Sequence, residues 1–474
     1  MIKNVFKKSL VIGIIILFLG TSVIPFVSSR KTLETSAFVA IETTNDCDWI
    51  VDDEGDGDFT SIQDAVDAAN ENDVICVYSG KYDESVYVNK TLKILGNDSE
   101  YPPNGDDKSK PLTDCIEIFD CSNVILSNFS VYLTVPSGIG LKNAYDCIID
   151  SCNTTSLYMV NCHDIVVKNC NVSSSVIPRG ISLSYCNAIT ILDSICEASS
   201  ALEPTSGIYL EYSDNNYLIS NNCSGKPSPW TAPDVSIRLI SSDSNTIKDN
   251  TCWNSDIGIK VDVSSDNTII DNTIRVGETS DIAIELESSN NNDIINNVIE
   301  GSGNIGINLS NSNGNLIDKH EISKFEIGIR LYRSGKEKKN VITWNTLNDN
   351  KKYGMKLENT EGNEIRHNTF SFNGEYGISV DNSIYDDIQR NNICYNKMNE
   401  LIATNSIGYY PACWWGVKIG CYTKIIEIES SISIYPWVTD GEGPPWKART
   451  FPALYLHRIH ELFPILQRLL LQRY

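Results

Sequence analysis

A phrase that recurs every 22 to 25 residues constrains the fold of this chain more than any other feature. It reads Asn-x-Ile-x-x-Asn, then a polar turn, then Gly-Ile-x-Val or a close variant, as in "NTIKDNTCWNSDIGIKV" at 245–261. The leading residues are Asn245, Asn267, Asn292, Asn315, Asn340 and Asn363. Looser copies extend the series toward the N-terminus, so about a dozen units lie between residues 115 and 381.

Each unit alternates apolar and polar residues over four or five positions, which indicates a half-buried strand. Glycine and asparagine separate these strands, as turns with positive φ require. Short strands at this period without helices between them predict an all-β chain, a right-handed parallel β-helix of about twelve coils stacked at roughly 4.8 Å. Asparagines that recur at the turns are expected to form hydrogen-bonded ladders, in which His320 replaces one asparagine. Leucine-rich repeats share the period but require helices, which this pattern lacks.

The N-terminus has the pattern of a secretory signal. Lys3, Lys7 and Lys8 precede an apolar run from Leu10 to Val27. We expect residues 1–29 to be a signal peptide, or else a retained membrane anchor, followed by a linker at 30–45. Either alternative places the body of the protein outside the cytoplasm, as a secreted or cell-surface protein. Seven Asn-x-Ser/Thr sequons agree with a glycoprotein: Asn89, Asn97, Asn128, Asn153, Asn171, Asn222 and Asn308.

The net charge of −23 argues against a nucleic-acid partner, which would require a basic surface. A solenoid explains the length without several domains, so residues 46–437 are expected to form one monomeric β-helix, followed by a linker at 438–450. Residues 451–474 are basic and amphipathic, with Pro464 as an expected kink. This tail either contacts a membrane surface or packs on the last coil.

Fifteen cysteines in an exported chain first suggest disulfides, but the positions of four of them favour another role. Cys170, Cys196, Cys223 and Cys252 occupy a slot that holds isoleucine, leucine or phenylalanine in later coils. Because free cysteine packs as a small hydrophobic residue, we expect an inward column of thiols there. The disulfide candidate is instead Cys413 with Cys421, which bracket "CWWGVKIGC".

The N-terminal end of the β-helix is expected to carry a cap. In "GDFTSIQDAVDAA", Thr60 and Gln63 have capping-box spacing, and the apolar residues that follow form one helical stripe. The preceding loop, "DDEGDGDF", is rich in carboxylates, and Asp52, Asp56 and Asp58 are weak candidates for binding Ca²⁺. A solvated turn is the alternative.

Two segments carry a resemblance to known families. "DGDFTSIQDAVDAA" followed by "GKYDESVYVNKTLKILG" resembles the opening of pectin methylesterases and other pectate-lyase-like β-helices. The repeats resemble the NosD-type and carbohydrate-binding-and-sugar-hydrolase families, and "WWGVKIG" with "SISIYPWV" resembles a terminal block found after such helices. The resemblance implies the β-helix fold and covers roughly residues 48–437.

The chemistry of those families does not carry over to particular residues. The two aspartate-bearing segments of pectin methylesterases, Gly-x-Gln-Asp-Thr and Asp-Phe-Ile-Phe-Gly, do not occur. NosD implies copper, but the five histidines and four methionines are scattered rather than clustered. No cofactor is therefore assigned beyond the Ca²⁺ candidate.

Any site is expected on the outward face of the Gly-Ile-x-Leu-x strands, where the intervening positions point away from the core. Stacking places seven residues on one face: Arg238, Lys260, Asp262, Glu285, Glu287, Arg330 and Tyr332. These could bind an acidic glycan, with Lys260, Arg330, Asp262 and Glu285 as catalytic candidates and Tyr332 as a stacking platform. The alternative is a set of cross-strand ion pairs on a solvated sheet.

Three functions are consistent with the sequence. The first is an exported protein that binds or displays polysaccharide. The second is a polysaccharide lyase, hydrolase or epimerase, which would need a base with nearby cations or a pair of carboxylates. The third, by analogy with NosD, is an accessory protein for an extracellular metalloenzyme.

Overall fold

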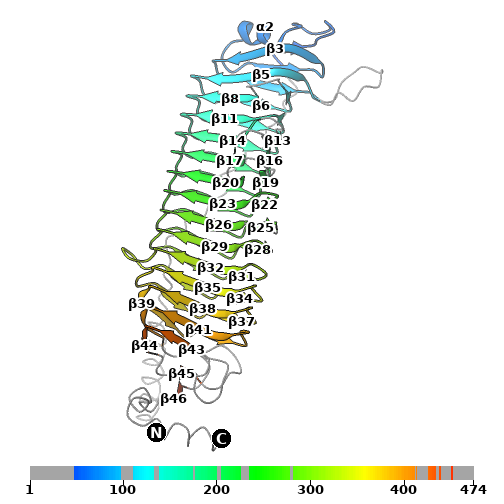
Figure 1. The fold of residues 1–474 in the computed structure, drawn as a ribbon. Helices are drawn as coiled ribbons and strands as arrows, with labels where there is room; N and C mark the ends of the chain where they lie inside the picture. Colours follow the sequence, from blue (N-terminus) through cyan, green and yellow to red (C-terminus); the bar gives the residue numbers. More distant parts are fainter. Residues whose placement is uncertain are drawn as a thin grey trace, which may run out of the picture. The chain divides into compact units, whose positions relative to one another are not determined.

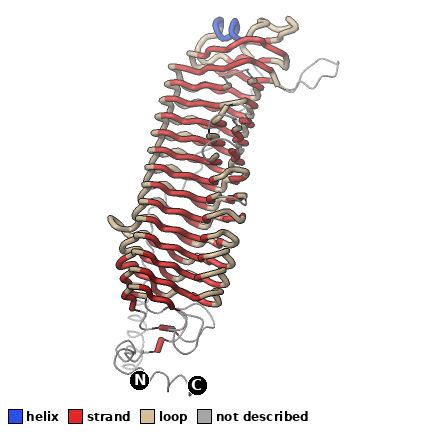
Figure 2. The backbone as a smooth tube through the Cα atoms, in the orientation of Figure 1, coloured by secondary structure: helices blue, strands red, loops and turns tan. Residues whose placement is uncertain are grey.

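A computed structural model describes residues 47–97, 110–132, 138–173, 177–199, 204–225, 234–277, 281–410, 413, 425–433, 437–438 and 450–451. The expected signal peptide and linker at 1–45, most of the Trp-Trp-Gly block and residues 452–474 lie outside this described part. From Cys47 onward the chain forms one compact unit. That unit is a right-handed parallel β-helix whose coils lie one above another (Figures 1 and 2).

The larger sheet has 27 strands among the described residues and contains two rows, one strand of each row to most coils. The row that carries the predicted face comprises β3 (Lys81–Val88), β5 (Leu112–Phe119), β8 (Ile139–Lys142), β11 (Leu157–Val160), β14 (Arg179–Ser184), β17 (Ser206–Glu211), β20 (Val235–Ile240), β23 (Ile257–Asp262), β26 (Ile282–Glu287), β29 (Ile305–Ser310), β32 (Ile327–Tyr332), β35 (Tyr353–Glu358), β38 (Tyr376–Asp381), β41 (Asn399–Thr404) and β43 (Ile425–Ile428). We call this row the long-strand row.

The second row of the larger sheet consists of shorter strands: β7 (Ser130–Val131), β10 (Asn153–Thr154), β13 (Asn171–Ser173), β16 (Ile195–Ala198), β19 (Asn222–Gly225), β22 (Thr251–Trp253), β25 (Thr273–Val276), β28 (Val298–Gly301), β31 (Glu321–Ile322), β34 (Thr346–Asn348), β37 (Thr369–Ser371) and β40 (Asn392–Cys394). Strands β45 (Trp437–Val438) and β46 (Thr450–Phe451) pair antiparallel with each other.

The smaller sheet has 17 strands in the described part of the chain. They are β1 (Trp49–Val51), β2 (Val74–Val77), β4 (Lys93–Gly96), β6 (Ile125–Ser127), β9 (Ile148–Asp150), β12 (Val166–Lys168), β15 (Thr190–Leu192), β18 (Tyr217–Ile219), β21 (Thr246–Lys248), β24 (Thr268–Ile270), β27 (Asp293–Ile295), β30 (Leu316–Asp318), β33 (Val341–Thr343), β36 (Glu364–Arg366), β39 (Ile384–Gln389), β42 (Ile407–Tyr409) and β44 (Ser431–Ser433).

The fold class is as predicted, but the structure has about 15 turns rather than twelve. The additional coils lie mainly at the N-terminal end, where Leu92 and Val124 occupy the turn position that later coils give to asparagine. These coils lack the repeated phrase, so the sequence pattern does not reveal them. Their alternating apolar residues still form strands, because side chains on the inward face bury hydrophobic area.

Asparagine ladders hold the turns in register, as predicted. Within the ladder Asn267 Oδ1 accepts hydrogen bonds from the backbone N (2.8 Å) and Nδ2 (3.1 Å) of Asn245. Asn267 Nδ2 in turn donates to Ser242 O (3.1 Å) and Asn292 Oδ1 (3.0 Å). An amide both donates and accepts, so the Asn267 side chain is fully satisfied. The ladder that contains Asn267 ends on Asp386, whose carboxylate accepts hydrogen bonds from the backbone N and Nδ2 of Asn363 and has no amide protons that need an acceptor.

The predicted thiol column is confirmed for three of its four members. Cys196, Cys223 and Cys252 are stacked in register, buried and free. Cys170 is also a free, buried thiol, but the prediction of its slot is wrong, because Val172 pairs with Cys196 there. The segment "IVVKNC" offers two buried apolar residues from which to count, Ile165 and Val167, and only Val167 lies in strand β12 and pairs in register with Ile191. Cys170 lies in a turn instead, where its backbone N donates to Ser194 Oγ at 3.1 Å.

A short helix, α2 (Ile62–Ala68), covers the first coil, and its predicted apolar stripe is buried. The N-cap is Ser61 rather than the expected Thr60. The Glu84 carboxylate on β3 accepts from the backbone N of Ile62 (2.7 Å) and Gln63 (3.1 Å). Because Glu84 satisfies these two amides, Gln63 is not needed for a capping box and bonds elsewhere.

The predicted disulfide between Cys413 and Cys421 is wrong at Cys413, which is a free, fully buried thiol. Its Sγ donates to Ile388 O at 3.4 Å, so the side chain fills a core position. Cys421 lies outside the described residues. The structure instead joins Cys47 to Cys76, next to the first coil.

Candidate functional site

The long-strand row places outward side chains in two continuous columns. The first column runs Tyr87, Glu117, Gly140, Tyr158, Ser182, Tyr209, Arg238, Lys260, Glu285, Asn308, Arg330, Lys356 and Ser379. The second runs Phe119, Lys142, Val160, Ser184, Glu211, Ile240, Asp262, Glu287, Ser310, Tyr332, Glu358 and Asp381. The seven residues named from the sequence therefore lie on one face, while their roles stay a prediction.

Five of these seven residues form a tight ion-pair cluster around Lys260. The Lys260 ammonium lies 3.0 Å from Glu285, 3.4 Å from Glu287 and 3.5 Å from Asp262. Arg238 donates to Asp262 at 3.1 Å, and Asn308 donates to Glu285 at 3.1 Å. Two cations thus face three carboxylates, and the cluster carries a net charge of about −1 at neutral pH.

The electrostatics of this cluster do not suit Lys260 to act as a base. Burial alone would lower the pKa of Lys260, but Glu285 and Asp262 outweigh burial and raise it. Burial raises the pKa of Asp262, while Lys260 and Arg238 oppose that rise. A lysine that is held protonated cannot accept a proton, so this cluster has the character of ion pairing on the sheet.

The other two predicted residues, Arg330 and Tyr332, lie three coils further along. Arg330 Nε donates to Glu358 at 2.6 Å, and its guanidinium lies 5.2 Å from the centre of the Tyr332 ring. Burial would raise the pKa of Glu358, but Lys356 and Arg330 outweigh it and lower the pKa. Cations exceed carboxylates here, unlike in the cluster around Lys260.

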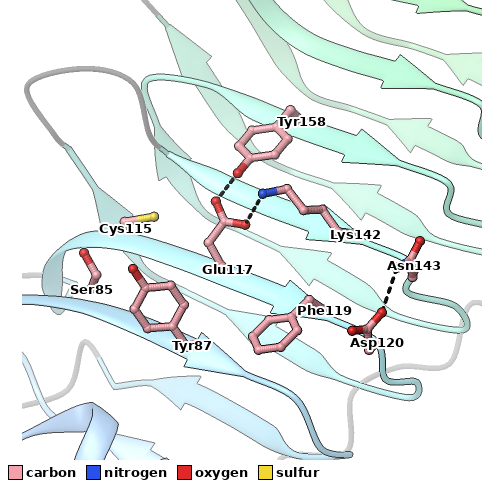
Figure 3. Close-up of a pocket in the computed structure, with 9 residues that line it drawn as sticks. All are labelled: Ser85, Tyr87, Cys115, Glu117, Phe119, Asp120, Lys142, Asn143 and Tyr158. Carbon is pink, nitrogen blue, oxygen red and sulfur yellow. Dashed lines mark hydrogen bonds and ion pairs between the residues drawn. The ribbon is translucent and has the colours of Figure 1, made fainter.

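The same columns contain a hollow of about 610 Å³ near the N-terminal end of the described β-helix. We call it the N-terminal hollow; it is lined by Ser85, Tyr87, Cys115, Glu117, Phe119, Asp120, Lys142, Asn143 and Tyr158. Figure 3 shows Tyr158 and Lys142 converging on the Glu117 carboxylate, with the rings of Tyr87 and Phe119 beside it. The Tyr158 hydroxyl donates to Glu117 Oε1, and Lys142 Nζ lies 3.2 Å from Glu117 Oε2. At the rim, Asn143 Nδ2 donates to Asp120 at 2.7 Å.

A glycine gives the N-terminal hollow its form. Gly140 lies between Glu117 and Tyr158 in the first column. A Cβ at residue 140 would lie 2.5 Å from the Tyr158 hydroxyl and 2.8 Å from Glu117 Oε1. Since real Cβ atoms do not approach so closely, only glycine lets Tyr158 reach across one coil to the carboxylate.

In the carboxylate-rich loop that was predicted as a Ca²⁺ candidate, two of the three aspartates accept hydrogen bonds from backbone amides of the same region. Asp58 accepts from the backbone N of Ile50 (2.9 Å), and Asp52 accepts from the backbone N of Glu54 (2.9 Å). Asp56 is exposed. No group of three or more His, Cys, Asp or Glu side chains suited to a metal ion occurs in the described ranges.

Sequence reasoning missed the residues of the N-terminal hollow. Gly138-Ile-Gly-Leu is one of the looser copies of the phrase, but the coils on either side of it have no Gly-Ile step. Extending the outward column one coil back from Gly140 would have identified Glu117. Tyr158 and Tyr87 could have followed from the same count.

Two family models match the chain. The model described as a right handed beta helix region matches residues 236–393. The model described as periplasmic copper-binding protein (NosD) matches residues 66–274. The two overlap and together span most of the described coils.

Solved structures with similar folds have low sequence identity. A periplasmic alginate epimerase, AlgG, is 13% identical over 74% of this chain and 78% of its own, with a TM-score of 0.39. The A-module of the Azotobacter vinelandii mannuronan C-5 epimerase AlgE6 is 11% identical over 78% and 93%, with a TM-score of 0.41. PfbA, a surface adhesin of Streptococcus pneumoniae, is 12% identical over 74% and 86%, with a TM-score of 0.37. A comparison with curated proteins finds no match. On its repeats, its coils and the family models, the chain is a right-handed parallel β-helix repeat protein that resembles the NosD type.

Proposed function

We propose that this is an exported protein that binds polysaccharide on the outward face of its long-strand row, with the N-terminal hollow as a sugar-binding site. The observation that carries the proposal is the combination of side chains in that hollow. Tyr87 is 53% exposed and can pack its ring against the apolar face of a sugar. Glu117, Asp120, Lys142 and Asn143 supply donors and acceptors for hydroxyl groups.

Binding fits this geometry better than catalysis. Burial and the hydrogen bond to Glu117 raise the pKa of Tyr158, so its phenol stays protonated at neutral pH. Lys260 also stays protonated, because its carboxylate partners raise its pKa. A lyase or epimerase needs a group that can accept a proton at working pH, and neither side chain meets that need.

Copper does not fit the described residues. Copper sites in proteins use Cys, His or Met ligands in groups. The buried thiols lie in core columns, and both ring nitrogens of His320 already bond to Asn297 and Asn345. Since no suitable group of three occurs in the part of the chain described, we derive no role for copper although the NosD model is named for it.

Export is supported by the basic and apolar start of the sequence. Among the described residues, no helix is long and apolar enough to cross a membrane. Expression with and without residues 1–29, followed by cell fractionation, tests this part of the proposal. Accumulation outside the cytoplasm without these residues would contradict their role as a signal.

The binding site is tested with two variants and a control. Tyr87→Ala removes the exposed ring, and Glu117→Gln removes the charge while keeping the shape. Each should weaken the affinity for a bound oligosaccharide by about three- to tenfold, as expected for loss of one aromatic or polar contact. Tyr385→Asn is the control, since Tyr385 is 68% exposed, lies outside the N-terminal hollow and has φ +58°.

A panel of neutral and acidic oligosaccharides, measured by isothermal titration calorimetry, identifies the ligand. If Tyr385→Asn weakens binding as much as Tyr87→Ala does, or if neither N-terminal variant weakens it, the N-terminal hollow is not the site.

A further inference from the structure

The chain around β32 is strongly basic, in contrast to the whole protein. Residues 330–339 hold five cations, Arg330, Arg333, Lys336, Lys338 and Lys339, against one carboxylate, Glu337, a net charge of +4. The whole chain carries −23. This segment runs from the outward face of β32 around the adjoining turn into the loop before β33, and that loop projects from the side of the coils in Figure 1.

Some of these cations are already paired, and others are not. Arg330 bonds to Glu358 and Lys339 pairs with Glu364, while Lys338 donates to Asn291 Oδ1 at 2.6 Å. Arg333 and Lys336 are exposed, and among the described residues neither has a carboxylate within 4.0 Å. The pair Arg333 and Lys336 therefore provides positive charge that the described residues do not neutralise.

The backbone at Arg333 has the conformation that this turn adopts in other coils. Arg333 has φ +50°, a conformation that favours asparagine over other non-glycine residues. The equivalent turn position holds Asn311, Asn359, Asn382 and Asn405 in four coils and Tyr212, Ser241, Val263 and Ser288 in four others, each with φ between +47° and +55°. The positive φ therefore belongs to the repeat, and asparagine is a compatible substitute at residue 333.

The surroundings of Arg333 suit a polymer rich in hydroxyl and carboxylate groups. Its guanidinium lies 4.9 Å from the centre of the Tyr332 ring, and Arg330 approaches the same ring at 5.2 Å. Lys356 follows Arg330 in the first column. The preceding coil places two uncharged residues in the same columns, the half-buried Ser310 and the buried Asn308, so no carboxylate from that coil stands beside Arg330 or Tyr332 in these columns.

We infer that Arg330, Tyr332, Arg333, Lys336 and Lys356 form a second binding site, the basic corner, for the carboxylate groups of an acidic polysaccharide. Arginine recognises carboxylates through paired donors, and the Tyr332 ring can pack against a sugar. Nine coil steps separate Glu117 from Arg330 in the first column, so the basic corner is about 43 Å from the N-terminal hollow and does not depend on it.

An acidic glycan fits this corner better than a nucleic acid does. Nucleic-acid binding generally requires a continuous basic surface. Here the next residues along the second column are Glu358 and Asp381, and the cluster around Lys260 on the other side is net negative. The basic corner is therefore not the continuous basic surface that nucleic-acid binding requires.

The test uses the full chain and a double variant, Arg333→Asn with Lys336→Asn. Asparagine suits the backbone at residue 333, so folding should be unaffected. The control is Lys324→Asn, because Lys324 is also exposed with positive φ (+71°) but lies in a different turn of the coil. Binding to polygalacturonate, dextran and a single-stranded oligonucleotide is measured at about 0.01 M and about 0.15 M salt.

We expect the double variant to bind polygalacturonate roughly five- to tenfold more weakly at low salt, as loss of two exposed ionic contacts predicts. Lys324→Asn should bind like the wild type, and dextran binding should be the same in all three proteins. Unchanged polygalacturonate binding in the double variant would overturn the site, and equally tight binding of the oligonucleotide would overturn its assignment to a glycan. Neither result would change the outcome of the Tyr87→Ala test, so failure of the basic corner can be distinguished from failure of the N-terminal hollow.

Discussion

His320 makes the stability of the β-helix sensitive to acid in a way that one substitution should remove. The imidazole stands in an asparagine ladder, with Nε2 3.2 Å from Asn297 Nδ2 and Nδ1 3.0 Å from Asn345 Oδ1. Asn297 Nδ2 is a donor, so Nε2 must accept and only Nδ1 carries a proton. A second proton on Nε2 would face the amide donor inside the core.

The magnitude follows from the shift in protonation. Burial lowers the pKa of His320 to about 4, compared with 6.5 in the unfolded chain. The unfolded state therefore binds a proton first as pH falls. The contribution of His320 to the free energy of unfolding is fully present above pH 6.5 and is lost as the pH falls from about 6.5 to about 4. Below that pH this contribution does not change further. At about 1.4 kcal/mol per pKa unit, the loss reaches roughly 3 kcal/mol, and most of it is present by about pH 4.5.

The assay compares His320→Asn with the wild type by urea unfolding at about pH 7.5 and about pH 4.5. Asparagine restores the ladder residue, and any cost of its smaller size is the same at both pH values. The wild type should lose about 2 to 3 kcal/mol more than the variant on acidification. His163→Asn, at an exposed histidine, should behave like the wild type. An equal loss in His320→Asn and the wild type would refute the reasoning.

Three further substitutions test other parts of the structure. Asn267→Ala should lower the free energy of unfolding by about 3 to 5 kcal/mol, since it removes four buried hydrogen bonds, whereas Asn304→Ala, at an exposed asparagine, should change it little; equal effects would contradict the ladder. Lys260→Met should destabilise the fold by roughly 1 to 3 kcal/mol, and by less in acid, where its carboxylate partners are protonated. If this variant loses glycan binding but keeps its stability, a structural role for Lys260 is contradicted. Gly140→Ala should displace Tyr158 and weaken oligosaccharide binding about three- to tenfold, and unchanged affinity in calorimetry would show that the Tyr158–Glu117 contact is not part of the site.

The repeated phrase was sufficient to predict the fold and the part of the outward face that the regular repeats build. Because a strand alternates its side chains and coils stack in register, counting along Gly-Ile-x-Leu places Lys260 beside Glu285 and Asp262 beside Glu287, as the structure has them. The asparagine ladders, including the separate ladder that contains His320, followed from the same period.

Other features depend on contacts that the period does not encode. The link between Cys47 and Cys76 joins residues outside the repeats. The predicted slot of Cys170 was two positions from the correct residue, Val172, because the segment offers two apolar residues from which the slot can be counted. The N-terminal hollow depends on the missing side chain of Gly140, and the basic corner on a loop between two coils. Such sites arise where the repeat is interrupted, so a pattern that describes the repeat does not predict them.

Hydroxyl-radical footprinting of tyrosine side chains, with and without the bound oligosaccharide, tests most directly whether the N-terminal hollow is a sugar-binding site. Tyr87 and Tyr385 are both exposed, at 53% and 68%, so we expect both to react with radicals when no sugar is present. We predict that the sugar protects Tyr87 from oxidation and leaves Tyr385 unchanged. Protection of Tyr385 with continued oxidation of Tyr87 would contradict the account.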